Sequence, residues 1–427
     1  MNNKTYFQLI PRRWKYLNII DYLLPIYIVM SVPLFYMGWH YSFVFKFIGI
    51  FISIIYLFKF APLQTKTNNI FNVFILLVTL SIIQYSYNDR PIEGYFGEVS
   101  NYVAAMLFYY VGASDDRLGR HFYNRLLYSI VIVFTIGLIF YFLTPSWYVA
   151  RNLEIINNQS GVEYNEINVL AQMRFSAFFG DSYYVSHLSV FAVAIAVFGV
   201  AYKKGKEKVL AYVGLTIGLL SSIACMHRAA ILGSAIALIL FAYFYLKTQN
   251  HLYKFYFGII VIVLLLAIVI IFAGTGDRMD TLFEMLTNRV DDNMSLGKAL
   301  DERKFTKELM DDMKFYIFGH GLGSGGVGMR AYGYPGISDM QYVKMFYENG
   351  VVGAVLFILI ILQTLRKGIK YIRYFLTEDV IILFILLAML GSNSLSIYYF
   401  IVYPFWYAVG RINNSNYLHR LKNKEWK

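Results

Sequence analysis

Runs of about 20 mostly apolar residues recur along nearly the whole length of this 427-residue chain. A helix of that length crosses the hydrocarbon core of a bilayer, and it satisfies its own backbone polar groups there. The chain is 58% hydrophobic and only 15% charged, more apolar than a soluble domain of this size requires. The pattern therefore predicts an all-α polytopic membrane protein.

The apolar runs predict about twelve transmembrane helices. They are expected at residues 19–38, 43–58, 69–84, 99–113, 126–143, 183–201, 209–225, 229–246, 255–273, 341–364, 379–396 and 398–411. Segment 165–182 is less apolar, and we expect it to be re-entrant or interfacial. If this segment spans instead, the number of helices becomes thirteen and the topology after it inverts.

These helices divide the chain into three parts. Residues 1–273 hold nine helices and a smaller outer segment, 144–182. Residues 274–340 form a charged outer loop domain, in which apolar residues at helical spacing predict two amphipathic helices. Residues 341–427 hold the last three helices and a basic tail.

Charge sets the expected orientation. The net charge is +12, and excess Lys and Arg normally lie in short cytoplasmic connections. With both termini cytoplasmic, most of the 38 Lys and Arg residues fall on that side, so the basic balance does not call for nucleic acid as a partner. The single cysteine, Cys225, excludes an intramolecular disulfide and a CxxC metal site.

Two arginines stand out against this apolar background. Arg228 interrupts the apolar run SSIACMHRAAILG, and the twelve-helix topology puts it at the outer end of its helix. Arg174, in QMRFSAFFGDSYY, reaches the same level from the preceding outer segment. Two guanidiniums at one depth predict an anion site, because their planar fork suits phosphate or pyrophosphate. The alternatives are snorkelling at a helix end, or a pair with Asp181.

Two further motifs lie at the predicted outer face. FGHGLGSGGVG (318–328) has six glycines but no GK[ST] ending, so we expect a flexible turn whose N–H groups approach a ligand, not a nucleotide loop. Arg330 follows as a further anion contact or a solvated side chain. In GISDMQYVKMFYENGVVG (336–353), Asp339 is interpreted as a helix N-cap, as a general base, or as both.

The order of these motifs resembles the O-antigen polymerase and O-antigen ligase superfamily of bacterial envelopes. The resemblance covers roughly residues 165–360, from RFSAFFGDSYYVSHLSVF through SSIACMHRAAILG to FGHGLGSGG and SDMQYVKMFYENGVVGAVLF. It implies a GT-C-type membrane glycosyltransferase that needs no metal, cofactor or nucleotide sugar. The implied donor is a glycan on undecaprenyl pyrophosphate, delivered to the periplasmic leaflet.

The resemblance also implies roles for residues. Arg174 and Arg228 would hold the donor pyrophosphate and stabilise its charge as the glycosidic bond breaks. The ligases have a histidine as catalytic base at the position of Asp339, while Glu348 matches the rest of that motif together with its glycines. This departure favours a polymerase. Alternatively, Asp339 orients the acceptor, and His320, His227 or no side chain acts as the base.

The tyrosines at the outer mouth are interpreted as sugar-binding faces or as membrane-interface anchors. His227 is expected to pack or to hydrogen-bond, since no second histidine lies at the spacing of a metal site. The candidate substrate-binding side chains are His227, Asp181, Tyr183, Tyr184, His320, Arg330, Tyr342 and Glu348.

We therefore expect an inner-membrane polymerase that joins undecaprenyl-pyrophosphate-linked repeat units at the periplasmic face, with a chain-length regulator as a further partner. The first alternative is the ligase, whose acceptor is lipid A–core. The second is a polysaccharide or lipid transporter without chemistry. A nearly charge-free membrane midplane argues against transport, because transporters place polar or broken helices there.

Overall fold

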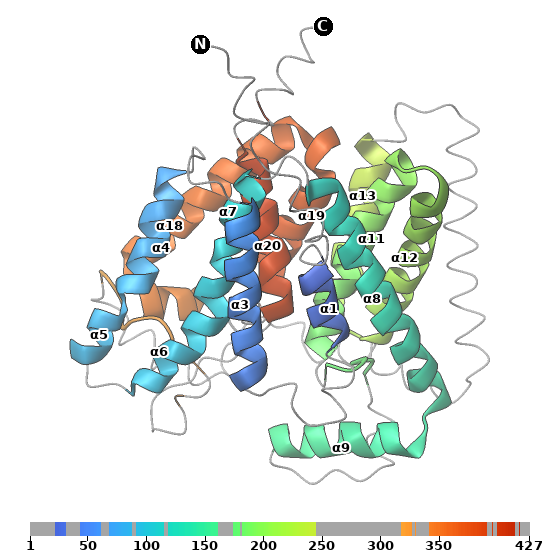
Figure 1. Cartoon of the computed structure of the whole chain (residues 1–427), viewed down its shortest axis with the longest axis horizontal. Coiled ribbons are helices and arrows are strands. Elements are labelled where there is room, and N and C mark those ends of the chain that lie inside the picture. Colours follow the sequence, from blue (N-terminus) through green and yellow to red (C-terminus); the bar gives the residue numbers. More distant parts are fainter. Residues whose placement is uncertain are drawn as a thin grey trace, which may run out of the picture.

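The structure is a computed structural model. It describes residues 22–30, 43–60, 68–87, 91–114, 118–160, 174–179, 182–244, 317–326, 329, 341–390, 395, 399–414 and 418. Within these residues the regular structure is entirely helical (Figure 1). The predicted helix at 255–273 and the two amphipathic helices in 274–340 lie outside the described residues, as does most of the predicted helix at 19–38.

The first half of the described chain runs from α1 to α9. Its helices are α1 (Leu23–Val29), α3 (Phe43–Phe60), α4 (Asn69–Leu80), α5 (Ile82–Tyr87), α6 (Ile92–Glu98), the π-helix η3 (Val99–Val103), α7 (Ala104–Ser114), α8 (Leu118–Leu143) and α9 (Ser146–Ser160). The second half holds α11 (Ser182–Tyr202), α12 (Gly205–Ala224), α13 (Arg228–Phe244), α18 (Gln341–Lys370), α19 (Ile372–Ala388) and α20 (Tyr399–Ile412).

Four of these helices are long and apolar enough to cross a membrane: α8 over Phe122–Leu143, α11, α12 and α18. Shorter apolar helices add Ile48–Phe58, Asn69–Gln84, Ala104–Ser114 and Ala229–Ala242. The protein is thus a helical membrane protein, as the apolar runs predicted.

Two helices begin well before their predicted starts: α8 starts at Leu118 and not at residue 126, and α19 is the second. Instead of starting at residue 379, α19 starts at Ile372, so that Glu378 and Asp379 lie inside it and are buried. The helix accommodates Glu378 because Arg411, in the last turn of α20, places its Nε 2.6 Å from the Glu378 carboxylate. Sequence hydropathy counts these charges as polar and cannot register that one of them is paired.

The helices pack in two groups that meet along α19 and α20. In one group α7 packs against α20 and α3, and α4 against α18; in the other, α11 packs against α12, α13 and α19 (Figure 1). Small residues allow the closest approaches. Ser222 on α12 bridges the second group, because its hydroxyl lies 2.9 Å from Ser189 Oγ on α11 and 2.8 Å from Ser234 Oγ on α13. Such hydroxyl contacts join helices where hydrocarbon offers no other partner.

The starts of α11, α13 and α18 lie at one end of the bundle, here called the site end. The ring of His187, near the start of α11, lies 5.2 Å from that of Phe384, near the end of α19. Gln341, the first residue of α18, donates its N–H to the Met389 carbonyl just after α19. Helix α9 lies across this end, roughly perpendicular to the long helices (Figure 1).

Candidate functional site

The site end carries two clusters of motif residues. The first, the arginine–histidine cluster, comprises the segment 174–179, the start of α11 at Ser182 and Tyr183, and the turn from Cys225 to Arg228. The second, the glycine-loop cluster, comprises the loop 317–326 with Glu98, Lys344, Glu348 and Gly350.

The arginine–histidine cluster forms where α12 ends. A turn at Cys225 and Met226 separates α12 from α13, which begins at Arg228. The N–H of Phe175 donates to the carbonyl of Ala224 at 3.0 Å, so the segment that carries Arg174 is bonded to this turn. The predicted proximity of the two arginine segments is therefore present in the backbone, although the Arg228 side chain lies outside the described part of the structure.

His227 has two close neighbours from α11. Its Nε2 lies 2.8 Å from the hydroxyl of Ser182, and the ring of Tyr183 lies 4.2 Å from the imidazole ring. His227 is 9% exposed, whereas Ser182 and Tyr183 are only half-buried. The expectation that His227 makes a hydrogen bond is confirmed, and its partner is a hydroxyl at the surface of the cluster.

The backbone around this cluster is strained. Within the described residues, a positive φ outside glycine occurs at Thr144 (43°), Ala177 (49°) and Met226 (55°). Ala177 and Met226 lie in the two segments that converge on His227, and Thr144 leads into α9, where Tyr148 donates its hydroxyl to the Ala177 carbonyl at 3.1 Å. Such conformations cost of order 1–3 kcal/mol each and are concentrated at functional sites.

The glycine-loop cluster forms around a kink in α18. Gly350 has φ 64° and ψ −169°, which interrupts the helix and frees carbonyl groups in the turn before it. The glycine loop supplies hydrogen-bond partners for these carbonyl groups in place of the interrupted helix. His320 donates its N–H to Tyr347 O and Gly321 donates to Glu348 O, each at 2.9 Å, while Val352 donates to Ile317 O at 3.2 Å. The two glycine motifs that sequence analysis treated separately thus hold one another.

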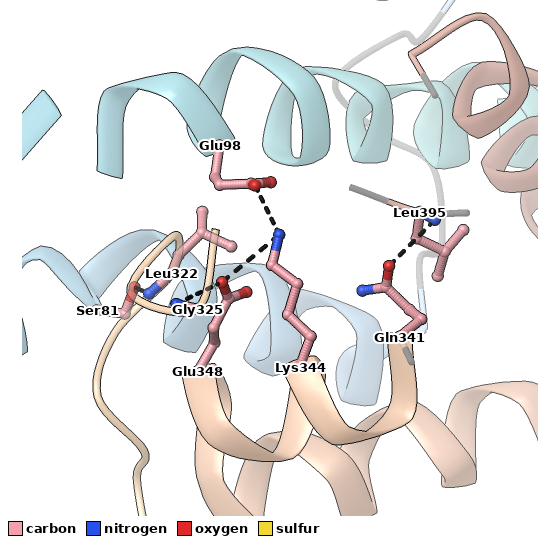
Figure 2. A network of polar contacts seen from close by, with 8 residues as sticks. All are labelled: Ser81, Glu98, Leu322, Gly325, Gln341, Lys344, Glu348 and Leu395. Atoms are coloured by element: carbon pink, nitrogen blue, oxygen red, sulfur yellow. Dashed lines mark hydrogen bonds and ion pairs between the residues drawn. The ribbon is translucent and has the colours of Figure 1, made fainter. Parts of the chain in front are cut away.

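Two buried side chains, Lys344 and Glu348, and the partly buried Glu98 complete this cluster (Figure 2). Lys344 Nζ lies 2.6 Å from Glu98 Oε1 and 3.6 Å from Glu348 Oε1, and the N–H of Gly325 donates to Glu348 Oε1 at 3.2 Å. The exposed fractions of the Lys344 and Glu348 side chains are 1% and 2%. A buried ammonium between carboxylates is stable only because each group has such partners.

The loop is also attached to the first half of the chain. The hydroxyl of Ser81, between α4 and α5, accepts the Leu322 N–H at 2.9 Å (Figure 2). Gln84 donates its side-chain amide to the Phe318 carbonyl at 3.1 Å. The expectation that the N–H groups of this turn approach a ligand is wrong for residues 320, 321, 322 and 325, because their N–H groups donate to Tyr347, Glu348 and Ser81.

Several residues predicted to bind substrate instead make contacts with other residues of the protein. Glu348 is engaged in the charge cluster. His320 is 5% exposed and stacks on Tyr347 at 4.2 Å, and Tyr184 is 3% exposed and stacks on Phe179 at 5.5 Å. Tyr342 is half-buried and donates its hydroxyl to the Leu386 carbonyl at 2.8 Å. Asp339, Asp181 and Arg330 lie outside the described residues.

Two residues of these clusters escaped sequence analysis. Glu98 is the last residue of α6, in a weakly apolar stretch with no motif around it, and its partner Lys344 lies 246 positions away. Ser182 sits beside the motif residues Asp181 and Tyr183, but a lone serine at a helix start reads as an N-cap. The sequence signal that could have indicated Glu98 was Lys344, because a lysine inside an apolar run requires a carboxylate partner elsewhere in the chain.

The described residues bring together no group of three or more His, Cys, Asp or Glu side chains that could hold a metal ion. No protein-family model matches the chain, and a comparison with curated proteins finds no match.

Proposed function

We propose that this chain is a GT-C-type membrane glycosyltransferase with about twelve transmembrane helices, and that it polymerises lipid-linked glycan repeat units. One observation carries the proposal: the Phe175–Ala224 hydrogen bond joins the segment of Arg174 to the turn that opens on Arg228. Two arginines from separate motifs thereby start from neighbouring backbone positions at one end of the bundle. A lone arginine snorkelling at a helix end does not require a second arginine-bearing segment bonded to its turn.

In the proposed reaction the two guanidiniums bind the pyrophosphate of an undecaprenyl-pyrophosphate-linked donor. Their fixed positive charge stabilises the negative charge that develops on the pyrophosphate as the bond to the anomeric carbon breaks. A hydroxyl of the next lipid-linked unit attacks that carbon, and undecaprenyl pyrophosphate leaves. Both lipids enter laterally from the bilayer.

The proposed orientation puts the site end at the periplasmic face of a bacterial inner membrane and both termini in the cytoplasm. The connection between α11 and α12, at the opposite end, supports this orientation because it consists of Lys203 and Lys204, and Lys206 and Lys208 follow in the first turn of α12. The glycine-loop cluster would then hold the entrance of α18, two residues after Asp339, at the acceptor side. A chain-length regulator remains the expected protein partner.

The proposal is tested by the electrophoretic glycan profile of a deletion strain complemented with variants. A single-repeat band on lipid A–core, replaced by a ladder on complementation, supports a polymerase. A bare core with accumulated lipid-linked polymer identifies the ligase, and an unchanged ladder leaves transport as the remaining class. Arg174→Ala is expected to fail to restore the ladder. The matched control is Arg151→Ala, which removes an arginine that pairs with the exposed Glu154 on α9 at the same end.

A further inference from the structure

A glycosyl transfer needs a group that takes the proton of the attacking hydroxyl. The arginine–histidine cluster contains a hydroxyl and an imidazole in hydrogen-bond contact, Ser182 Oγ and His227 Nε2, at 2.8 Å. They come from two helix starts that lie 45 positions apart in sequence. Ser182 is half-buried and His227 is 9% exposed, so the serine is the more exposed of the two residues.

The imidazole is held in place from several sides. The Tyr183 ring packs against it at an interplanar angle of 38°, and the turn before it is held in a left-handed conformation at Met226. The bond from Phe175 to Ala224 fixes the same turn to the Arg174 segment. A strained turn stabilised from outside holds a side chain more closely than a relaxed one.

A second histidine on the same helix shows what a purely structural contact looks like. His187, one turn further along α11, is 1% exposed, and its Nδ1 lies 2.7 Å from the Tyr183 carbonyl and 3.1 Å from Ser186 Oγ. Its ring packs against Phe384 in the core. His227 differs because its hydroxyl partner, Ser182, is half-buried, whereas Ser186 is 1% exposed and donates its hydroxyl hydrogen to the Tyr183 carbonyl at 2.8 Å. A hydroxyl near the surface can pass on a proton.

We propose that Ser182 and His227 form the proton relay of the transfer, an inference that rests on the proposed function. The acceptor sugar hydroxyl gives its proton to Ser182 Oγ as its oxygen bonds to the anomeric carbon. Ser182 gives its own proton to His227 Nε2, and the pyrophosphate oxygen keeps the electron pair of the broken bond. The imidazolium then releases its proton to water.

The charges around the relay couple it to donor binding. The titratable and charged groups near His227 are Tyr183 on α11, Arg174 on the 174–179 segment, Cys225 on its own turn and Arg228, which follows it. The Arg174 guanidinium disfavours a second positive charge nearby, whereas a bound pyrophosphate neutralises it and favours a charged imidazole. The relay therefore accepts a proton only when the donor is in place.

The test uses the purified full-length chain and the lipid-linked glycan extracted from the deletion strain. Ser182→Ala and His227→Gln are each expected to lower kcat by about 100-fold, with KM for the donor changed less than about threefold. The double variant should be no worse than the poorer single variant, because the two groups act as one unit. The acid limb of the pH–rate profile should vanish in His227→Gln. The matched control, Ser186→Ala, removes the other serine–histidine contact and should keep kcat within about twofold.

The outcomes separate this inference from the proposed function. If Arg174→Ala is inactive while His227→Gln retains kcat, the relay is wrong and the glycosyltransferase stands; loss of activity in Asp339→Asn alone would then assign the base to Asp339. If the wild-type chain forms no polymer from this donor, the proposed function itself fails. If His227→Gln does not fold, the activities of Ser182→Ala and Ser182→Thr are compared instead. Ser182→Thr keeps a hydroxyl and is expected to retain most of the activity.

Discussion

The two clusters at the site end differ in where their left-handed residues fall. In the glycine-loop cluster a positive φ occurs at Gly319, Gly321, Gly323 and Gly350, where the missing side chain makes it inexpensive. In the arginine–histidine cluster it occurs at Ala177 and Met226, where an L side chain makes it costly. The backbone of the glycine-loop cluster is therefore unstrained. The backbone of the arginine–histidine cluster is strained, and contacts with neighbouring segments must stabilise it.

The clusters also differ in how their polar groups are used. Lys344 and Glu348 are almost completely buried and bind one another. Arg174, Ser182 and Tyr183 are half-buried, within reach of a ligand from outside. The comparison teaches that the most conspicuous motif of the sequence, the glycine run, is a scaffold, and that the half-buried polar groups lie in the less conspicuous arginine–histidine cluster.

The largest loss of stability is expected from Gly319→Ala. A Cβ there would lie 2.5 Å from both Glu348 O and Gly350 N, at a φ of 74°. Neither backbone can move without breaking the loop, so we expect more than about 3 kcal/mol of destabilisation and little folded protein on size-exclusion chromatography. The control is Gly97→Ala in α6, where an added Cβ meets nothing within 4 Å. A stable Gly319→Ala protein would contradict the scaffold role.

The second largest loss of stability, about 3–5 kcal/mol, is expected from Lys344→Met, because this change leaves Glu98 and Glu348 together without a cation. Adding Glu98→Gln should recover part of this loss, since it removes one of the two charges. Thermal unfolding in detergent measures both effects. If the double variant is less stable than Lys344→Met, the ion pair is not what holds the loop.

A much smaller change is expected from Ala177→Gly. Glycine relieves the left-handed strain by about 1 kcal/mol but loses a buried methyl worth a similar amount, so the free energy of unfolding should change by less than about 1 kcal/mol. Activity should fall by about tenfold, because the 174–179 segment is no longer confined. Full activity would show that the strain does not position Arg174.

The smallest effect on stability is expected from Arg174→Ala. Its side chain is half-buried, so the melting temperature of the apoprotein should change little. Inorganic pyrophosphate should raise the melting temperature of the wild-type chain and of Arg151→Ala, but not of Arg174→Ala, because only a ligand bound to the folded state stabilises it. An equal rise in all three proteins would mean that pyrophosphate binds elsewhere.

Much of the helical framework could be predicted from the sequence, because a run of apolar residues reports directly on contact with lipid or core. The predicted helices at 183–201 and 209–225 match α11 and α12 to within a few residues. The break before Arg228 was also predicted, from the polar residues at its position. The start of α19 was wrong, because the Glu378–Arg411 pair joins residues of different helices.

The sequence by itself determined that this is a helical membrane protein and which segments carry its rare polar residues, since both follow from local hydropathy and residue type. Only the tertiary structure decided which of those residues meet. It placed Glu98 against Lys344, the glycine loop against the kink at Gly350, and Ser182 against His227. Such pairings depend on how whole helices pack, and a buried charge or hydroxyl gives no sign in its own segment of which distant partner satisfies it.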